Sequence, residues 1–487
     1  ANSTTRSVIV SPTTAKITVD GTLDESIWSE APNIGDLIQQ QPNPGMAPSE
    51  RTEVTLLYDA NNLYIGVKAY DSEPDKVIGT QMERDASLSS DDHLEIVLDT
   101  FRDQRNAFYF ATNPSGAFVD GLAFGNEELN TDWNAIWDVR TKRTDFGWVA
   151  EIAIPFKSLN FPANESEWGF NISRNVYRKL EESRWSGAHL KTDFLQIAEA
   201  GKITNLNGLN QGIGLDIRPF IAASWLDSKT SSNDGFDAEP GLDFSYNVTS
   251  SIKLTGTLNT DFGETEVDAR QINLDRFSLF FPEKRSFFLE DAGVFAFAST
   301  GPSSPGGIPS ASADVFPFFS RRIGLVNGQE VPINVGLKGT GKTGNTDFGV
   351  LYAGTDNTSF VDSKEFIVAR VKQNLFEQSY IGGIFTDGNP ALGAEGQTYG
   401  VDARLATSDF LGTDKNFVVN AYGTRSDNGG SSDNDKSYGV SAHYPNDSYV
   451  GELVYRVIEE NFDPALGFVQ RNNVRMYRAG ASYNPRP

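Results

Sequence analysis

Two tryptophans four residues apart are the side chains best suited to ligand chemistry in this sequence. Trp133 and Trp137 lie beside Asp132 and Asn134. An exposed indole ring can stack on the apolar face of a pyranose while neighbouring carboxylate and amide groups bind its hydroxyls. We therefore expect carbohydrate binding by Trp133, Trp137, Asp132 and Asn134. In the alternative interpretation one or both rings pack in the protein core, and the spacing is compatible with both.

An acidic segment supplies the candidate metal ligands. Asp91 and Asp92 precede a predicted strand, and Asp85 and Asp99 flank them. Ca²⁺ prefers several oxygen ligands in a flexible geometry, so the segment predicts a calcium site built from these four carboxylates, with Asp91 or Asp92 at its centre. The competing interpretation is a turn rich in Asp that caps chain ends and keeps the surface soluble.

The composition excludes several kinds of chemistry. The chain has no cysteine, which excludes disulfides, thiolate zinc sites and cysteine nucleophiles, and its three histidines leave little for histidine-based metal sites or triads. The formal net charge is −24 at pH 7. A surface this acidic repels phosphate backbones, so we expect no nucleic-acid partner.

Paired carboxylates are the remaining route to catalysis. A glycoside hydrolase needs two carboxylates at a fixed separation, one of them with a raised pKa. With 65 acidic residues in the chain, chance pairs are certain and no pair is privileged. Glu264, Glu266 and Asp268 stand out, but an interior loop with ion pairs is the favoured explanation for them. The enzyme hypothesis therefore stays open, with binding favoured over hydrolysis.

Residues 1–205 have the pattern of short strands that is typical of a β-sandwich. Short apolar runs bounded by Asp, Asn, Gly or Pro predict strands at 53–58, 62–70, 93–99, 107–113, 147–154 and 168–176. The one helical signal is at 23–31. Short strands at close spacing with almost no helix favour a sandwich domain.

Residues 206–487 alternate strictly between apolar and polar positions. The run from Ile213 to Trp225 is one example, and the pattern recurs up to Tyr444. Period-two segments separated by Gly, Asn, Asp and Ser turns predict an antiparallel β-barrel of the transmembrane type. A large soluble sheet or a second sandwich has the same period, but so many consecutive strands would leave exposed edges. The predicted fold class is therefore all-β.

Residues 261–295 interrupt the alternation with mixed charges and phenylalanines. The segment is too polar to face lipid and too aromatic to stay in water. We expect a loop or short helical insert folded against the barrel interior or the N-terminal domain, with the aromatic pairs Phe280-Phe281 and Phe287-Phe288 as anchors. The Gly/Pro/Ser run at 299–312 predicts a flexible linker.

Three N-terminal motifs resemble the family 9 carbohydrate-binding modules. They are the Asp-Gly, Leu-Asp-Glu, Trp, Ala pattern at 19–31, the run Ser-Asp-Asp-His-Leu-Glu-Ile-Val-Leu-Asp at 90–99, and Gly-Trp-Val-Ala-Glu-Ile-Ala-Ile-Pro-Phe at 147–156. The resemblance implies a β-sandwich, often with bound calcium, that displays sugars between aromatic side chains.

The remainder is similar to a poorly characterised family of Gram-negative surface proteins that join this module to an outer-membrane β-barrel. The similar segments are 259–266, 280–290 and 319–324. One departure is the ending Asn484-Pro485-Arg486-Pro487, a poor last strand because proline cannot donate to a ladder. We therefore expect either a truncated chain or a barrel closed by a missing C-terminal part.

The functional expectation is a carbohydrate-binding protein of the Gram-negative outer membrane. Its expected partners are a polysaccharide or other glycan and the outer-membrane lipid, and the side of the membrane that carries the sandwich is open. Two alternatives remain: a carboxylate-dependent glycan hydrolase, and a structural or transport barrel with the sandwich as a plug or cap.

Overall fold

A computed structural model describes most of the chain. The described residues are 6–124, 128–131, 133–162, 165–210, 212, 214–226, 235–249, 251–260, 283, 285–297, 315–326, 329–359, 361–376, 378–391, 395–413, 415–429, 433–446 and 448–485. Several predictions lie outside them: the linker at 299–312, the acidic residues Glu264, Glu266 and Asp268, and the anchors Phe280 and Phe281.

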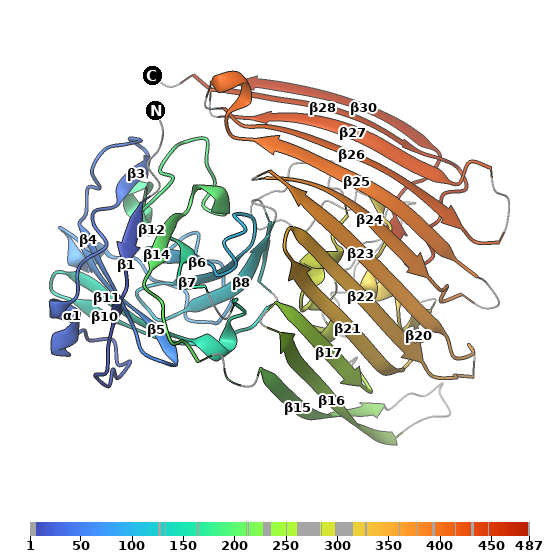
Figure 1. Ribbon diagram of the computed structural model, residues 1–487, viewed down its shortest axis with the longest axis horizontal. Coiled ribbons are helices and arrows are strands. Elements are labelled where there is room, and N and C mark those ends of the chain that lie inside the picture. The colour runs from blue at the N-terminus through green and yellow to red at the C-terminus, as the bar shows by residue number, and fades with distance from the viewer. Residues whose placement is uncertain are drawn as a thin grey trace. The chain divides into compact units, whose positions relative to one another are not determined.

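The protein is all-β, as predicted, and forms two units, Ala1–Ile213 and Gly214–Pro487, which are called unit 1 and unit 2 (Figure 1). Among the described residues, no helix is both long and apolar enough to span a membrane. The helical elements are α1 (Ser26–Glu30), α2 (Ser286–Leu289) and the 3-10 turns η1 (Pro74–Lys76), η2 (Phe156–Ser158), η3 (Tyr177–Lys179), η4 (Ile197–Glu199), η5 (Ala292–Phe295), η6 (Ser320–Arg322) and η7 (Phe410–Gly412).

Unit 1 is a sandwich of two sheets, called sheet A and sheet B. Sheet A runs β1 (Ser7–Ile9), β14 (Gly201–Thr204), β12 (Trp168–Val176), β6 (His93–Asp99), β7 (Ala107–Thr112), β8 (Phe118–Phe124) and β9 (Glu128–Asn130). In addition, β13 (Glu181–Arg184) pairs with β12, and β3 (Ile38–Gln41) pairs with β13. Sheet B runs β10 (Asp138–Thr144), β11 (Gly147–Pro155), β5 (Asn62–Tyr70), β4 (Thr52–Tyr58) and β2 (Ser11–Pro12).

The core of unit 1 lies between its two sheets. Leu94, Ile96 and Leu98 of β6 meet Val67 of β5 and Trp148 of β11 in one buried apolar cluster. Alternate side chains of a strand point to opposite faces, so each strand gives every second residue to this core. The six strands predicted in the N-terminal half are all present, and α1 lies inside the predicted helical segment.

Unit 2 is built on one curved, twelve-stranded antiparallel sheet (Figure 1). Among the described residues, β15 and β30 form its two edges. The strands, in sheet order, are β15 (Leu215–Leu226), β16 (Gly235–Thr249), β17 (Ile252–Leu258), β21 (Ile333–Thr343), β22 (Thr346–Thr355), β23 (Glu365–Leu375), β24 (Ser379–Asp387), β25 (Gln397–Thr407), β26 (Phe417–Asp427), β27 (Lys436–Pro445), β28 (Tyr449–Ile458) and β30 (Val474–Tyr483). Short pairs link β18 (Val315–Phe316) with β29 (Phe468–Val469) and β19 (Leu325–Val326) with β20 (Gln329–Glu330).

The segment 285–297, which contains α2 and η5, packs on one face of this sheet, called here the inner face. Lys338 of β21 is buried and donates to the carbonyl oxygens of Phe287, at 2.6 Å, and Glu290. Arg370 of β23 donates from Nε to Ala296 O at 3.1 Å. It also forms a buried bidentate pair with Asp402, at 2.6 and 2.8 Å. Inner-face charges therefore hold the backbone of the segment in place.

Aromatic rings of the segment rest on glycines of the inner face. A Cβ at Gly349 would lie 2.8 Å from the Phe295 ring, and one at Gly400 would lie 2.8 Å from the Phe297 ring. These distances are shorter than real Cβ contacts. The absence of a side chain is thus what lets the rings reach the sheet.

We expect Gly349→Val to loosen this packing. The three atoms nearest to an added Cβ at Gly349 belong to Val294 and Phe295, so the variant overpacks the contact between segment and sheet. The expected cost is about 1–3 kcal/mol of unfolding free energy, measured by denaturant titration of the full chain. Gly339→Val on β21 is the matched control, because nothing lies within 4 Å of its Cβ position. Equal stability of both variants would contradict the packing.

Candidate functional site

The tryptophan pair lies between β9 and β10 and partly faces the sandwich core. Both indole rings are half-buried. Trp133 packs on Phe108, with ring centroids 5.2 Å apart. Trp137 makes T-shaped contacts with Phe110 and Phe118, with ring centroids 5.0 and 5.3 Å apart. Each ring thus has one side fixed by aromatic packing.

A buried carboxylate fixes the backbone of the tryptophan segment. Asp120 of β8 is fully buried and accepts the N–H of Ala135, between the two tryptophans. Arg84 donates to both oxygens of Asp120, at 2.8 and 3.0 Å, and its guanidinium lies 5.1 Å from the Phe118 ring. The ion pair neutralises the buried carboxylate and keeps the segment against the sheet.

Trp137 also lines a groove of about 650 Å³ on the outer face of sheet B. The groove is lined by the chain at 16–19 and by Ile136, Trp137 and Asp138. Asn62 and Tyr64 of β5 line it as well. A volume of this order suits a small ligand, and pockets of about 300–1,000 Å³ are typical for such sites.

Hydrogen bonds fix the polar groups of the groove. The Tyr64 hydroxyl donates to Asp59 Oδ2 at 2.9 Å and accepts from Asn62 Nδ2 at 3.0 Å. The pKa of Tyr64 is raised to about 12, mainly by burial and secondly by the Asp59 carboxylate. The hydroxyl therefore stays protonated near neutral pH. An aromatic ring, an amide, a carboxylate and a lysine around one groove are the groups that can hold a sugar ring and its hydroxyls.

The four predicted sugar-binding residues are only partly brought together. Trp137 lines the groove, Trp133 packs on β7, and Asn134 is exposed. Asp132 lies outside the described residues. The sequence interpretation missed Asn62 and Tyr64, because the pairing of β5 with β11 is what carries them to the groove.

The predicted calcium ligands are spread over separate turns. Asp91 accepts Thr80 N and Gln81 N, each at 2.9 Å, and Asn113 Nδ2 at 2.8 Å. Burial alone would raise the pKa of Asp91, but these hydrogen bonds outweigh it and hold the pKa below its ordinary value. Asp92 accepts Ile78 N at 3.0 Å and Tyr177 N at 2.7 Å. Both carboxylates thus organise the loop before β6.

The other two carboxylates have similar roles. Asp99 accepts the N–H groups of Asp103 and Gln104, at 3.2 and 2.9 Å, and Asp85 lies 3.4 Å from Arg84 Nε. In the part of the chain that the structure describes, no group of three or more Asp, Glu or His residues could hold a metal ion. Calcium binding stays a prediction.

Glu151 of β11 joins two of the N-terminal sequence motifs. It is fully buried and accepts Asp20 N at 2.9 Å and Gly21 N at 3.0 Å. The Trp28 ring covers Gly66 on the neighbouring strand, 2.7 Å from where a Cβ would stand. Burial raises the pKa of Glu151 to about 7, despite the two backbone donors. The carboxylate thus anchors the opening motif on the outer face of sheet B.

This anchor predicts a pH-dependent stability. Because the folded-state pKa of about 7 lies above the ordinary 4.5, the stability that Glu151 contributes is fully present below about pH 4.5 and is lost as pH rises through about 7. The expected loss is about 3 kcal/mol, measured by denaturant titration of the full chain with tryptophan fluorescence. Glu151→Gln should flatten the profile between about pH 5 and about pH 8. The exposed Glu30→Gln serves as control, and an unchanged profile in Glu151→Gln would refute the assignment.

A polar cluster on sheet A is a second candidate surface of unit 1. Glu95 accepts from Tyr109 Oη at 2.8 Å and from Asn175 Nδ2 at 3.2 Å, and lies 3.9 Å from His93 Nε2. Burial raises the pKa of Glu95. The alternation along 93–99 could have indicated that His93 and Glu95 lie on the same face of β6. It could not have indicated Tyr109 and Asn175, because these partners of Glu95 lie on other strands.

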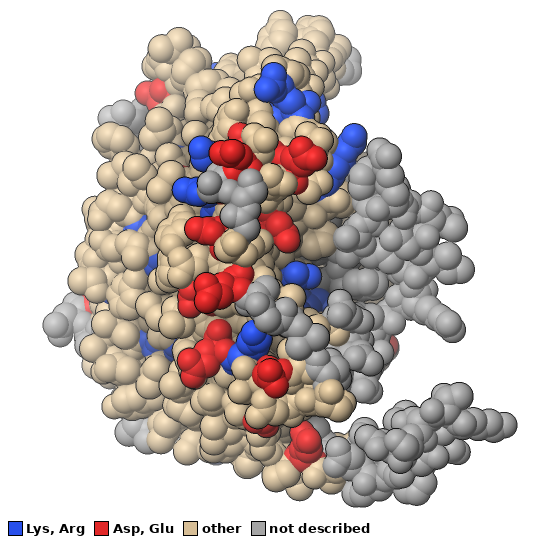
Figure 2. All heavy atoms as spheres, turned by 90° about the vertical axis from the view of Figure 1, so that its right-hand side faces the viewer, with Lys and Arg blue, Asp and Glu red and all other residues tan. Residues whose placement is uncertain are grey.

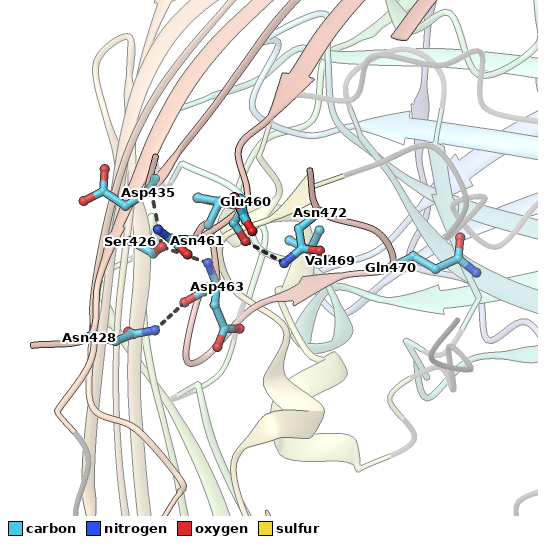
Figure 3. A pocket seen from close by; sticks show the side chains of 10 residues that line it. Ser426, Asn428, Asp435, Glu460, Asn461, Asp463, Val469, Gln470 and Asn472 are labelled. Atoms are coloured by element: carbon cyan, nitrogen blue, oxygen red, sulfur yellow. Dashed lines mark hydrogen bonds between the residues drawn. The ribbon is translucent and has the colours of Figure 1, made fainter. Parts of the chain in front are cut away.

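Unit 2 has a polar pocket of about 510 Å³ between the connections that follow β26 and β28 (Figure 3). The amide groups of Asn428, Asn461 and Asn472 donate to the backbone oxygens of Asp463, Asp433 and Glu460, each at 2.8 Å. Carboxylates of Glu460 and Asp463 also line it. The pocket therefore offers mainly hydrogen-bond acceptors.

Two family models match the chain. Residues 19–189 match the carbohydrate family 9 binding domain-like family, and residues 212–305 match a domain of unknown function (DUF5916). Residues 19–189 therefore form a domain like the family 9 carbohydrate-binding modules. Among curated proteins, none matches the chain.

Several solved structures are similar. A family 9 carbohydrate-binding module from Caldicellulosiruptor kristjanssonii in complex with glucose is 19% identical, with a TM-score of 0.32, and covers 42% of this chain and 98% of its own. The complex with cellotriose is 18% identical, with a TM-score of 0.31, and covers 41% and 92%. Pseudomonas putida OprB is 10% identical, with a TM-score of 0.23, and covers 75% and 85%.

Proposed function

We propose that the chain is a carbohydrate-binding protein of the Gram-negative outer membrane, with unit 1 as the binding domain and unit 2 as the membrane-spanning part. The observation that carries the binding role is the Trp137 groove, which lies within the domain similar to family 9 modules. A sugar ring would lie against Trp137, with Asp138 and Asn62 near its hydroxyls.

The distribution of side chains on the sheet of unit 2 supports the membrane-spanning role. On the outer face, Val371 is 50% exposed and Val401 is 64% exposed. On the inner face, Lys338 and Arg370 are each 1% exposed. A soluble sheet buries its apolar face and exposes its charges, and this sheet does the reverse. An apolar face of this extent is costly in water and is stabilised in lipid.

The cross-strand register makes the outer face continuous. Val371 of β23 is opposite Gly383 of β24, which is opposite Val401 of β25. Tyrosines lie at strand ends on the last pair: Tyr449 begins β28, Tyr483 ends β30, and their rings stack with centroids 4.9 Å apart. Tyrosine at strand ends is typical of the interface girdles of outer-membrane sheets.

One preparation tests both halves of the proposal. The full chain is expressed in a Gram-negative host, the outer-membrane fraction is solubilised in detergent, and the chain is passed over immobilised polysaccharides. We expect the chain in that fraction, with heat-modifiable migration on gels, and retention by at least one polysaccharide. A chain found only in the soluble fraction would refute the membrane role, and a chain retained by none would refute the binding role.

A further inference from the structure

The connections between strands of unit 2 differ at the two ends of its sheet. Because neighbouring strands are all antiparallel and follow one another along the chain, successive connections alternate between the ends. At the first end four connections have two or three residues, and one is longer. They are 250–251, 344–345, 376–378, 446–448 and, as the longer one, 408–416.

Every connection at the second end is long. Each has eight residues or more: 227–234, 259–332, 356–364, 388–396, 428–435 and 459–473. Outer-membrane sheets have short periplasmic turns and longer extracellular loops, so this asymmetry gives unit 2 a direction in the membrane. The first end is the periplasmic end, and the second faces the outside.

The connections at the second end are acidic. Each of them has more acidic than basic residues. Figure 2 views the molecule from the right-hand side of Figure 1 and shows Asp and Glu side chains gathered on that face. Charged connections of this kind belong in water, beyond the lipid.

The chain enters the sheet of unit 2 at the first end. Leu215, the first residue of β15, is opposite Tyr246, near the end of β16 and the short connection 250–251. Asn247 N donates to Gly214 O at 2.9 Å. Gly214 directly follows Ile213, the last residue of unit 1. Unit 1 is therefore joined to the sheet at the end with the short connections.

We infer that unit 1 lies in the periplasm, so that the glycan it binds belongs to that compartment and not to the cell surface. The inference rests on the proposed membrane role of unit 2. The ligand chemistry is a chain of pyranose rings, which two sources supply: the insoluble glycan of the cell wall, and soluble oligosaccharides that have crossed the outer membrane.

Single cysteines test the direction, because the chain has none of its own. The reporters are Met82→Cys in unit 1, Leu411→Cys in the connection 408–416, and Ala391→Cys in the connection 388–396. Met82 and Leu411 are 79% and 82% exposed, and Ala391 is exposed. Intact cells are treated with a polymer-coupled maleimide too large to pass porins, before and after permeabilisation of the outer membrane.

We expect Ala391→Cys to react in intact cells, and Met82→Cys and Leu411→Cys to react only after permeabilisation. Reaction of Met82→Cys in intact cells, or no reaction of Ala391→Cys there, would overturn the inference while the chain remains in the outer-membrane fraction. Absence of the chain from that fraction would overturn the proposed membrane role as well.

A separate binding experiment distinguishes the two possible sources of the ligand. Solubilised wild-type chain is mixed with isolated cell-wall glycan and, separately, titrated with soluble oligosaccharides. Binding in either arm supports a periplasmic ligand and identifies its source. Binding only to polysaccharides too large to cross the membrane would overturn the ligand assignment.

Discussion

Replacing Trp137 by alanine is expected to raise the Kd for the bound glycan roughly 30-fold, about 2 kcal/mol of binding free energy. The ring lines the groove, and its position is fixed by Phe110 and Phe118. Its loss removes the stacking contact with the sugar while Asp138 and Asn62 remain. Titration of the detergent-solubilised full chain with oligosaccharide measures the effect.

Two control variants separate the groove from the other candidates in unit 1. Trp133→Ala removes the neighbouring ring, which packs on β7, and Glu95→Gln alters the polar cluster on sheet A. Both are expected to bind with a Kd close to that of the wild type. If Glu95→Gln lost much of its affinity while Trp137→Ala kept the wild-type Kd, the binding site would have to be assigned to the polar cluster on sheet A.

Replacing Val401 by arginine is expected to cost about 2–4 kcal/mol of stability in the membrane. Val401 is 64% exposed in the middle of the outer face, where lipid would surround it. In a soluble sheet the same change at so exposed a position would cost within about 0.5 kcal/mol. The unfolding free energy in lipid vesicles, measured by denaturant titration, separates the two cases.

Leu411→Arg is the matched control for this charge. Leu411 is 82% exposed, but it lies in the connection 408–416 and not within a strand. We expect it to tolerate arginine. Equal stability of the two variants would contradict a lipid-facing outer surface.

The fold was largely predictable because periodicity reports burial directly. Runs such as 62–70 and 168–176 could be identified as strands from their β-branched and aromatic residues, since these fit a pleated surface. The alternation after residue 213 likewise predicted the antiparallel strands of unit 2. Phe287 and Phe288 were identifiable as anchors, but the glycines that receive aromatic rings, such as Gly349, were not, because their contacts depend on sheet curvature and register.

The site was less predictable, because its partners are distant in the sequence. Trp137 was singled out for its ring chemistry, whereas Tyr64 reaches the same groove only through the pairing of β5, β11 and β10. Asp91 resembled a calcium ligand from its type alone. Its donors include the backbone N–H groups of Thr80 and Gln81 in a loop, and no residue pattern reveals these.

Affinity electrophoresis of the full chain tests carbohydrate binding by unit 1 most directly. The detergent-solubilised wild type and Trp137→Ala run side by side through native gels that each contain one polysaccharide from a broad panel. We expect at least one polysaccharide to slow the wild type and to leave Trp137→Ala at its unretarded position. If no polysaccharide slows the wild type, or if both proteins are slowed equally, the Trp137 groove is not a carbohydrate-binding site.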